Sequence, residues 1–184
     1  RLREEVKELP EDPFLVLPKN LGSSIEKKSS NGLMFEDSVD AILPVMSEVD
    51  FVGIFSNGKM FRGNANSKGQ NHWFETDTYN LDYSLVTQNH QMVKGSFSGN
   101  DWNQNDYEEY VNRSKEKLSL MERKPIKMKT GDYRTWFESA AVSDFLGMFS
   151  WNGISEASLR QGCSGFGKMR HNDITLSPKF SILE

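Results

Sequence analysis

Hydrophobic and polar positions alternate with a period of two through residues 49–98, which predicts a region rich in β-strands. The alternation is clearest where two faces separate, with Leu81, Tyr83 and Leu85 on one and Asp82, Ser84 and Val86 on the other. The predicted strands are Val49–Ser56, Lys59–Asn66, His72–Thr78, Tyr79–Gln88 and Gln91–Phe97. We therefore expect a meander of about four or five antiparallel strands.

Two short polar segments predict the turns of this meander. Asn57-Gly58 is the pair that two-residue hairpins prefer, because both central residues of such a turn need a positive φ. Ser67-Lys68-Gly69 predicts a second turn.

A period of 3.6 residues takes over after the strands and predicts an amphipathic helix over Asn105–Arg123. Asp101 or Asn103 is placed to cap its first turn, and Pro125 follows its end. The side chains expected to face the sheet are Tyr107, Tyr110, Val111, Ser114, Leu118 and Met121. Strands followed by a helix favour an α+β fold over alternating βαβ units.

The remaining segments predict shorter elements. Leu2–Leu9 has one apolar helical face and ends at Pro10, and a short helix follows Asp37 or Ser38 despite Pro44. Residues 14–34 have the composition of a connecting segment. Strands are predicted at Tyr133–Phe137 and Asp173–Leu176. A helix is predicted from Ala140 to about Trp151, with the buried set Val142, Phe145, Leu146 and Phe149.

Composition restricts the classes of function. The 184 residues carry a net charge of −4 without a basic block, so we expect no direct contact with nucleic acid. Twelve Phe, 4 Trp and 5 Tyr are more bulk than a disordered chain carries. No apolar run approaches the length of a membrane span, and a single cysteine favours a reducing compartment, so we expect a cytoplasmic protein. The chain starts at Arg1 and stops at Glu184 inside predicted elements, and we interpret it as a fragment.

Few residues offer chemistry. His72, His90 and His171 do not pair with one another or with cysteine at metal-ligand spacing. Cys163 lies eight residues before His171, so a cysteine nucleophile is one hypothesis and a half-buried thiol in a turn is the favoured alternative. Gly162–Gly167 lacks the Lys-Ser/Thr step of a phosphate-binding loop. The acidic residues Asp101, Asp106, Glu108 and Glu109 do not have the spacing of a calcium loop.

The last third of the chain resembles the TldD/PmbA family, also called modulators of DNA gyrase. The matching order is Thr130-Gly131-x-Tyr133, then Ala140-Ala141-Val142-x-x-Phe145-Leu146, then Gly-Cys-Ser at 162–164. An Ala65-Asn66-Ser67-x-Gly69 turn and the charged helix before residue 127 extend the resemblance to most of the chain from about Val49. The resemblance implies domain boundaries at 1–34 (end of an N-terminal domain and a connecting segment), 35–129 (a central α+β domain) and 130–184 (the start of a C-terminal domain).

The family pairs two related subunits, of which one carries a His-Glu-x-x-x-His zinc motif. Here the corresponding helix has Leu146-Gly147-Met148-Phe149-Ser150-Trp151-Asn152, without His or Glu. The resemblance therefore implies the PmbA-like (TldE-like) branch, a non-metal-binding subunit in a peptidase complex for proteolysis or peptide maturation. Zinc is expected only in a catalytic TldD-like partner, and we do not expect this chain to be active alone.

The resemblance also implies a dimer with a TldD-like or an identical subunit, and an unfolded peptide as substrate. Peptide would enter a groove and add as a strand to an exposed sheet edge. The expected groove residues are Tyr133, Thr135, Phe137, Leu146, Gly147, Trp151 and Asn152. Two hypotheses of other classes remain, a non-enzymatic adaptor that binds proteins through the 49–98 meander, and a hydrolase that uses Cys163 and His171.

Overall fold

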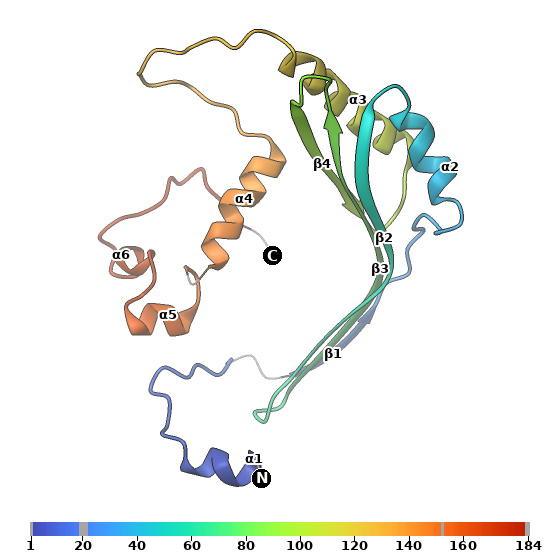
Figure 1. Ribbon diagram of the computed structural model, residues 1–184. Coiled ribbons are helices and arrows are strands. Elements are labelled where there is room, and N and C mark those ends of the chain that lie inside the picture. Colours follow the sequence, from blue (N-terminus) through green and yellow to red (C-terminus); the bar gives the residue numbers. More distant parts are fainter. Residues whose placement is uncertain (1, 19–21, 152, 183–184) are drawn as a thin grey trace. The chain divides into compact units, whose positions relative to one another are not determined.

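The computed structural model describes residues 2–18, 22–151 and 153–182, which fall into two compact units (Figure 1). The sheet unit comprises Asn20–Lys129, and the helical unit comprises Arg1–Lys19 with Thr130–Glu184. The chain thus combines helices with one mixed, mostly antiparallel sheet, which confirms the predicted α+β class. Among the described residues, no helix combines the length and the apolar character that crossing a bilayer requires.

The sheet is built around one long central strand, β3 (Gln70–Val86), which curves through the unit in Figure 1. β2 (Asp50–Ala65) pairs antiparallel with β3 over its whole length. Two shorter strands share the other side of β3. β1 (Gly22–Lys27) lies parallel to Gln70–Glu75, and β4 (Met92–Gly99) lies antiparallel to Tyr79–Val86.

This pairing divides the sheet into two parts with different surroundings. The part that contains β4 is covered on one face by α3 (Gln104–Met121) and by α2 (Ser38–Ile42) with its 3-10 extension η2 (Leu43–Met46). The other part, which we call the ribbon, consists of β1, Phe61–Ala65 and Gln70–Glu75, and no described helix covers it.

The core follows from the alternation along β3. Leu81, Tyr83 and Leu85 share one face as predicted, and they are buried because this face meets α3, while Asp82 is exposed on the opposite face. The other buried hydrophobic members of the core cluster are Ile42, Met46, Tyr107, Val111 and Leu118. The Tyr83 ring crosses β4 at Gly95, where an added Cβ would lie 2.4 Å from Tyr83 Cζ. A glycine is therefore needed where the ring passes.

The amphipathic helix is confirmed, with Tyr107, Val111, Ser114 and Leu118 buried. Of the two predicted caps, Asn103 is the residue that acts. Its side-chain oxygen accepts from the backbone N–H groups of Asn105 and Asp106. Met121 differs from the prediction, with 45% of its surface exposed, because it is the last residue of the helix and lies outside the buried set.

The predicted hairpin at Asn57-Gly58 is wrong, because β2 continues through these residues. They pair with Tyr79 and Thr78, and only Gly58 has a positive φ, whereas the predicted turn requires it at both positions. β3 is long enough to give every residue of β2 a partner, so the ladder is formed in place of the turn. The chain reverses at the second predicted turn, where Asn66 and Gly69 connect β2 to β3.

β1 lies in the segment that the composition assigned to a connection. All six of its residues are exposed, and its sequence, Gly-Ser-Ser-Ile-Glu-Lys, has no hydrophobic alternation. The strand forms because its backbone pairs with β3, which no local pattern reveals. The sheet is therefore a three-stranded antiparallel meander with one added parallel strand.

The helical unit contains α1 (Leu2–Glu5) with η1 (Val6–Glu8), α4 (Ser139–Ser150), α5 (Glu156–Gln161) and α6 (Gly167–Arg170). The predicted helices at 2–9 and 140–151 are thus confirmed. The predicted strands Tyr133–Phe137 and Asp173–Leu176 are wrong, since both segments are irregular and exposed. They have strand-like composition, but among the described residues no strand pairs with either segment.

The predicted burial on α4 is also wrong. Val142 and Phe145 are 40% and 49% exposed, and no residue of the helix is buried. Leu146 and Phe149 are half-buried. Edge-to-face ring pairs contribute to the packing of this unit, among them Phe137 with Phe145 at 5.2 Å and Phe149 with Phe166 at 4.9 Å between centroids. Within the described residues of the helical unit, α4 thus keeps an apolar face without a covering layer.

Candidate functional site

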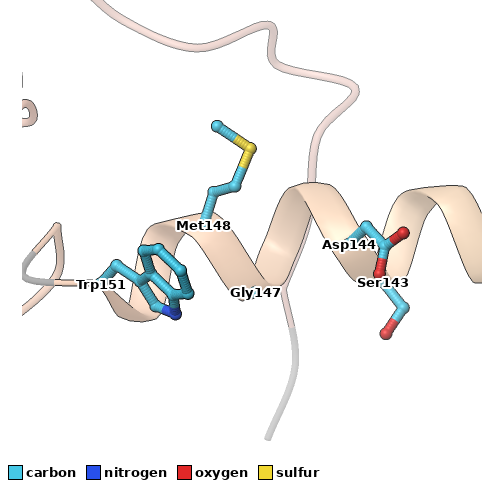
Figure 2. A pocket seen from close by; sticks show the side chains of 5 residues that line it. All are labelled: Ser143, Asp144, Gly147, Met148 and Trp151. Carbon is cyan, nitrogen blue, oxygen red and sulfur yellow. The ribbon is translucent and has the colours of Figure 1, made fainter.

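The α4 surface holds three of the residues that the sequence assigns to a groove. Leu146 and Gly147 lie in the helix, Trp151 is its C-cap, and Asn152 lies outside the described residues. Figure 2 shows an open pocket along this helix, lined by Ser143, Asp144, Gly147, Met148 and Trp151. Trp151 and Met148 are 85% and 67% exposed, so this surface offers apolar contact area.

The other groove candidates precede α4 in an irregular segment. Tyr133, Thr135 and Phe137 are all exposed, and Thr135 Oγ1 donates to the Tyr133 carbonyl at 3.3 Å. The Phe137 ring contacts Phe145, which brings this residue against the middle of α4. Of the candidates, the structure therefore brings Phe137 to the helix that holds Leu146 and Gly147.

Cys163 and His171 do not form a catalytic pair. The exposed Cys163 thiol donates to the Gln161 carbonyl at 3.8 Å, and none of the hydrogen bonds among the described residues joins it to His171. His171 is the C-cap of α6. A thiol needs an adjacent base to become a nucleophile, so this geometry gives the cysteine hydrolase hypothesis no support.

Acidic, histidine and cysteine side chains are the groups of this chain that could hold a metal ion. Within residues 2–18, 22–151 and 153–182, no three such side chains are grouped closely enough to hold an ion. His72 is half-buried in β3, and its Nδ1 lies 2.8 Å from Ser24 Oγ of β1. His90 is exposed in the β3–β4 turn with a φ of 60°.

The longest unpaired strand edge in the described part of the chain is the outer edge of β2, which the sequence did not single out. Its sixteen residues pair with β3 on one side, and no described strand pairs with the other side. Val52 and Ile54 lie on the face opposite α3, 64% and 76% exposed. A long edge with apolar side chains and without proline can accept another strand. The predicted turn at Asn57-Gly58 divided β2 into two short strands, so the sequence did not predict an edge of sixteen residues.

The ribbon has two unlike faces. One carries Ile25, Phe61 and Trp73, where the two aromatic rings lie 5.8 Å apart and Trp73 covers Gly63. Ion pairs of Lys27 with Glu75 and of Lys59 with Glu75 and Asp77 neutralise the charges of this face. The opposite face is polar and hollowed, and its lining side chains are Ser24, Glu26, Arg62, Asn64, His72 and Phe74.

Burial controls the ionisation of the tyrosines beneath α3. It raises the pKa of Tyr83 to about 12, and a hydrogen bond with Ser114 opposes this only in part. Burial also raises the pKa of Tyr107, with smaller contributions from Tyr83 and Glu108. Both phenols therefore remain neutral hydrogen-bonding groups of the core at physiological pH, and neither is placed to act as a general base.

Two carboxylates are stabilised by their neighbours, of which Asp82 is exposed and Glu156 is half-buried. Hydrogen bonds from Ser96 and Asn80 lower the pKa of Asp82 on the open face of the sheet. In the helical unit, hydrogen bonds from Arg170 and Arg160 lower the pKa of Glu156 to about 2. These pairs join β3 to β4 and α5 to α6, so we assign them structural roles.

Comparison with known proteins gives no match, since no family model, no curated protein and no solved structure is significantly similar to the chain. The resemblance to the TldD/PmbA family stays a prediction based on the residues quoted above.

Proposed function

We propose that the chain is the non-metal-binding subunit of a TldD/PmbA-like peptidase complex, and that it holds an unfolded peptide in extended form along β2. The complex carries out proteolysis or peptide maturation in the cytoplasm. Zinc is held by a TldD-like partner, which supplies the water-activating chemistry. This chain supplies the wall of the substrate groove and a surface for the dimer.

The observation that carries the proposal is the outer edge of β2. An extended peptide added there forms main-chain hydrogen bonds that do not depend on its sequence, as a subunit that receives varied unfolded substrates requires. Val52 and Ile54 supply apolar contacts at alternate positions of the added strand. β3 pairs with every residue of β2, so the edge is held in place before peptide arrives.

The apolar face of α4 supports the dimer surface. Val142, Phe145, Met148 and Trp151 are each at least 40% exposed on one twelve-residue helix and its C-cap. Large exposed aliphatic and aromatic side chains are typical of surfaces that another protein covers. A TldD-like subunit is the partner that the resemblance implies.

The adaptor hypothesis depends on the same edge of β2 and remains the second candidate. It differs in one respect, because an adaptor binds extended segments without a metal-bearing partner. Binding of peptide alone therefore supports either function, and association with a TldD-like subunit separates them.

The test is a reconstitution of this chain with a zinc-loaded TldD-like subunit. We expect a stable complex by size-exclusion chromatography with light scattering, and faster cleavage of an unfolded peptide than either subunit achieves alone. Val52→Lys combined with Ile54→Lys places charge on the β2 edge and should reduce cleavage without preventing association. A complex that never forms, with peptide still bound by this chain, would favour the adaptor.

A further inference from the structure

The polar face of the ribbon gathers hydrogen-bond donors around one hollow. The sheet register places Ser24, His72 and Asn64 in one row across the three strands, and Glu26, Phe74 and Arg62 in the next row. All six side chains line the same pocket. Neighbours across a strand pair have Cβ atoms about 5 Å apart and diagonal neighbours about 7–8 Å, within reach of a long side chain. The Arg62 guanidinium can therefore lie over the row that contains His72.

The hydrogen bond between Ser24 and His72 determines which nitrogen of the imidazole is left to bind another group. Ser24 Oγ lies 2.8 Å from His72 Nδ1. We assign the serine hydroxyl as the donor, which leaves the imidazole proton on Nε2 and makes that nitrogen a donor toward the hollow. The Asn64 amide adds a second neutral donor beside it in the register.

The charges of the hollow leave one cation without a partner. Glu26 is paired with Lys28 at 3.1 Å, and the side chain of Phe74 lies between Glu26 and Arg62 in the register. Arg62 forms no ion pair with any residue that the structure describes. A guanidinium with adjacent amide and imidazole donors matches an oxyanion, and its planar fork fits a carboxylate.

We propose that this hollow binds a carboxylate of the extended peptide held along β2. The inference rests on the proposed function, because Arg62 and Asn64 belong to β2 itself. A strand added to the outer edge places one residue directly beside Arg62, with its side chain on the same face. The bound peptide is thereby selected for an acidic side chain, or its own C-terminus, at that position.

The test compares three extended peptides of one sequence that differ at the position beside Arg62 and at the C-terminus. One has Glu and a C-terminal amide, the second has Gln and an amide, and the third has Gln and a free carboxylate. We expect the first or the third to bind the full chain about fivefold more tightly than the second, as one exposed charge pair permits. The tighter of the two identifies the source of the carboxylate.

Arg62→Gln should abolish this preference, and Arg113→Gln should keep it, because Arg113 lies on α3 and is paired with Glu109. A titration with acetate, followed by NMR, should shift the side-chain signals of His72 and Asn64 in the native chain and not in Arg62→Gln. Equal binding of the three peptides would overturn the inference and leave the edge proposal standing. Acetate shifts without binding of any peptide would instead overturn the edge proposal, together with the peptide as the source of the carboxylate.

Discussion

Tyr83 of β3 and Ser114 of α3 join the sheet to its helix through hydroxyl oxygens 2.8 Å apart. Both side chains are buried, at 4% and 6% exposure, so neither hydroxyl can exchange this partner for bulk water. Ser114 Oγ is also 3.3 Å from the Tyr110 carbonyl, and a serine hydroxyl has a single proton. The pair thus satisfies two polar groups inside an apolar layer and fixes the register of α3 on β3.

Tyr83→Phe removes one member of this pair and should lower the free energy of unfolding of the sheet unit by about 1–2 kcal/mol, because the other hydroxyl is left buried with a poorer partner. Ser114→Ala alone should lower the free energy of unfolding by a similar amount. The double variant should cost less than the sum, since no unpaired hydroxyl remains. Urea unfolding of the four proteins measures all three values, and strict additivity would contradict the coupling.

Gly95→Ala should destabilise the sheet unit by about 1–3 kcal/mol, because the new Cβ meets the Tyr83 ring at 2.4 Å and the buried ring has no space to move into. Gly32→Ala is the matched control in the same unit. Its Cβ would meet only the Asn100 carbonyl, at an ordinary 3.6 Å. Thermal unfolding of both variants is the measurement, and an equal effect would show that the ring is not fixed.

Raising the pH above 10 should destabilise the sheet unit, and Tyr83 contributes to this together with Tyr107, because burial raises the pKa of both phenols. The pKa of Tyr83 is raised from 10.0 to about 12 by burial, so at pH 11 the unfolded chain has lost a proton that the folded chain keeps. The folded state binds more protons there, and its stability therefore falls as the pH rises from 10 to 12. The total loss from this group is about 2–3 kcal/mol.

Tyr83→Phe should remove this contribution and make unfolding less steep above pH 10. The absorbance of tyrosinate, recorded together with circular dichroism, follows ionisation and unfolding at once. If Tyr83 ionises near pH 10 in a folded protein, the phenol is less buried than described.

Part of this fold follows from the sequence because burial leaves a periodic trace. Leu81, Tyr83 and Leu85 alternate since one face of β3 meets α3, and Asn103 precedes a helix with a regular apolar face. β1 leaves no such trace, because all of its side chains are exposed and only its backbone is paired. Asn57-Gly58 misled the prediction because a local turn preference was weaker than pairing along the whole of β3.

The candidate sites were less predictable for a related physical reason. The hollow on the ribbon joins Ser24, Arg62 and His72 from three strands, and their proximity depends on a register that no single segment encodes. The α4 residues are contiguous, so the sequence could place Leu146, Gly147 and Trp151 on one element. The sequence also predicted that α4 is buried, which is wrong. An apolar helix face has the same sequence pattern whether another protein or the chain itself covers it.

Acid should weaken the link between α5 and α6. The pKa of Glu156 is lowered from 4.5 to about 2 by hydrogen bonds from Arg170 and then Arg160. A depressed carboxylate pKa stabilises the folded state above 4.5, and this stabilisation is lost as the pH falls toward 2. NMR titration of the carboxyl group measures its pKa directly. Arg170→Gln should raise that pKa more than Arg160→Gln, and equal shifts would contradict the order of the two contacts.

Charge placed on the outer edge of β2 should block strand addition without unfolding the sheet. Val52 and Ile54 are exposed, so Val52→Lys with Ile54→Lys should change the free energy of unfolding by less than about 1 kcal/mol, while charged edge residues oppose pairing with another chain. We expect the affinity for an unfolded peptide, measured by fluorescence anisotropy, to fall about tenfold or more, as lost apolar contact predicts.

Met92→Lys is the matched control for this variant. Met92 is 47% exposed on β4, which lies on the other side of β3 from β2. Met92→Lys should leave the affinity for the peptide unchanged if β2 is the edge that accepts the strand. A loss in Met92→Lys with none in the β2 variant would move the binding edge to β4 and contradict the proposed site.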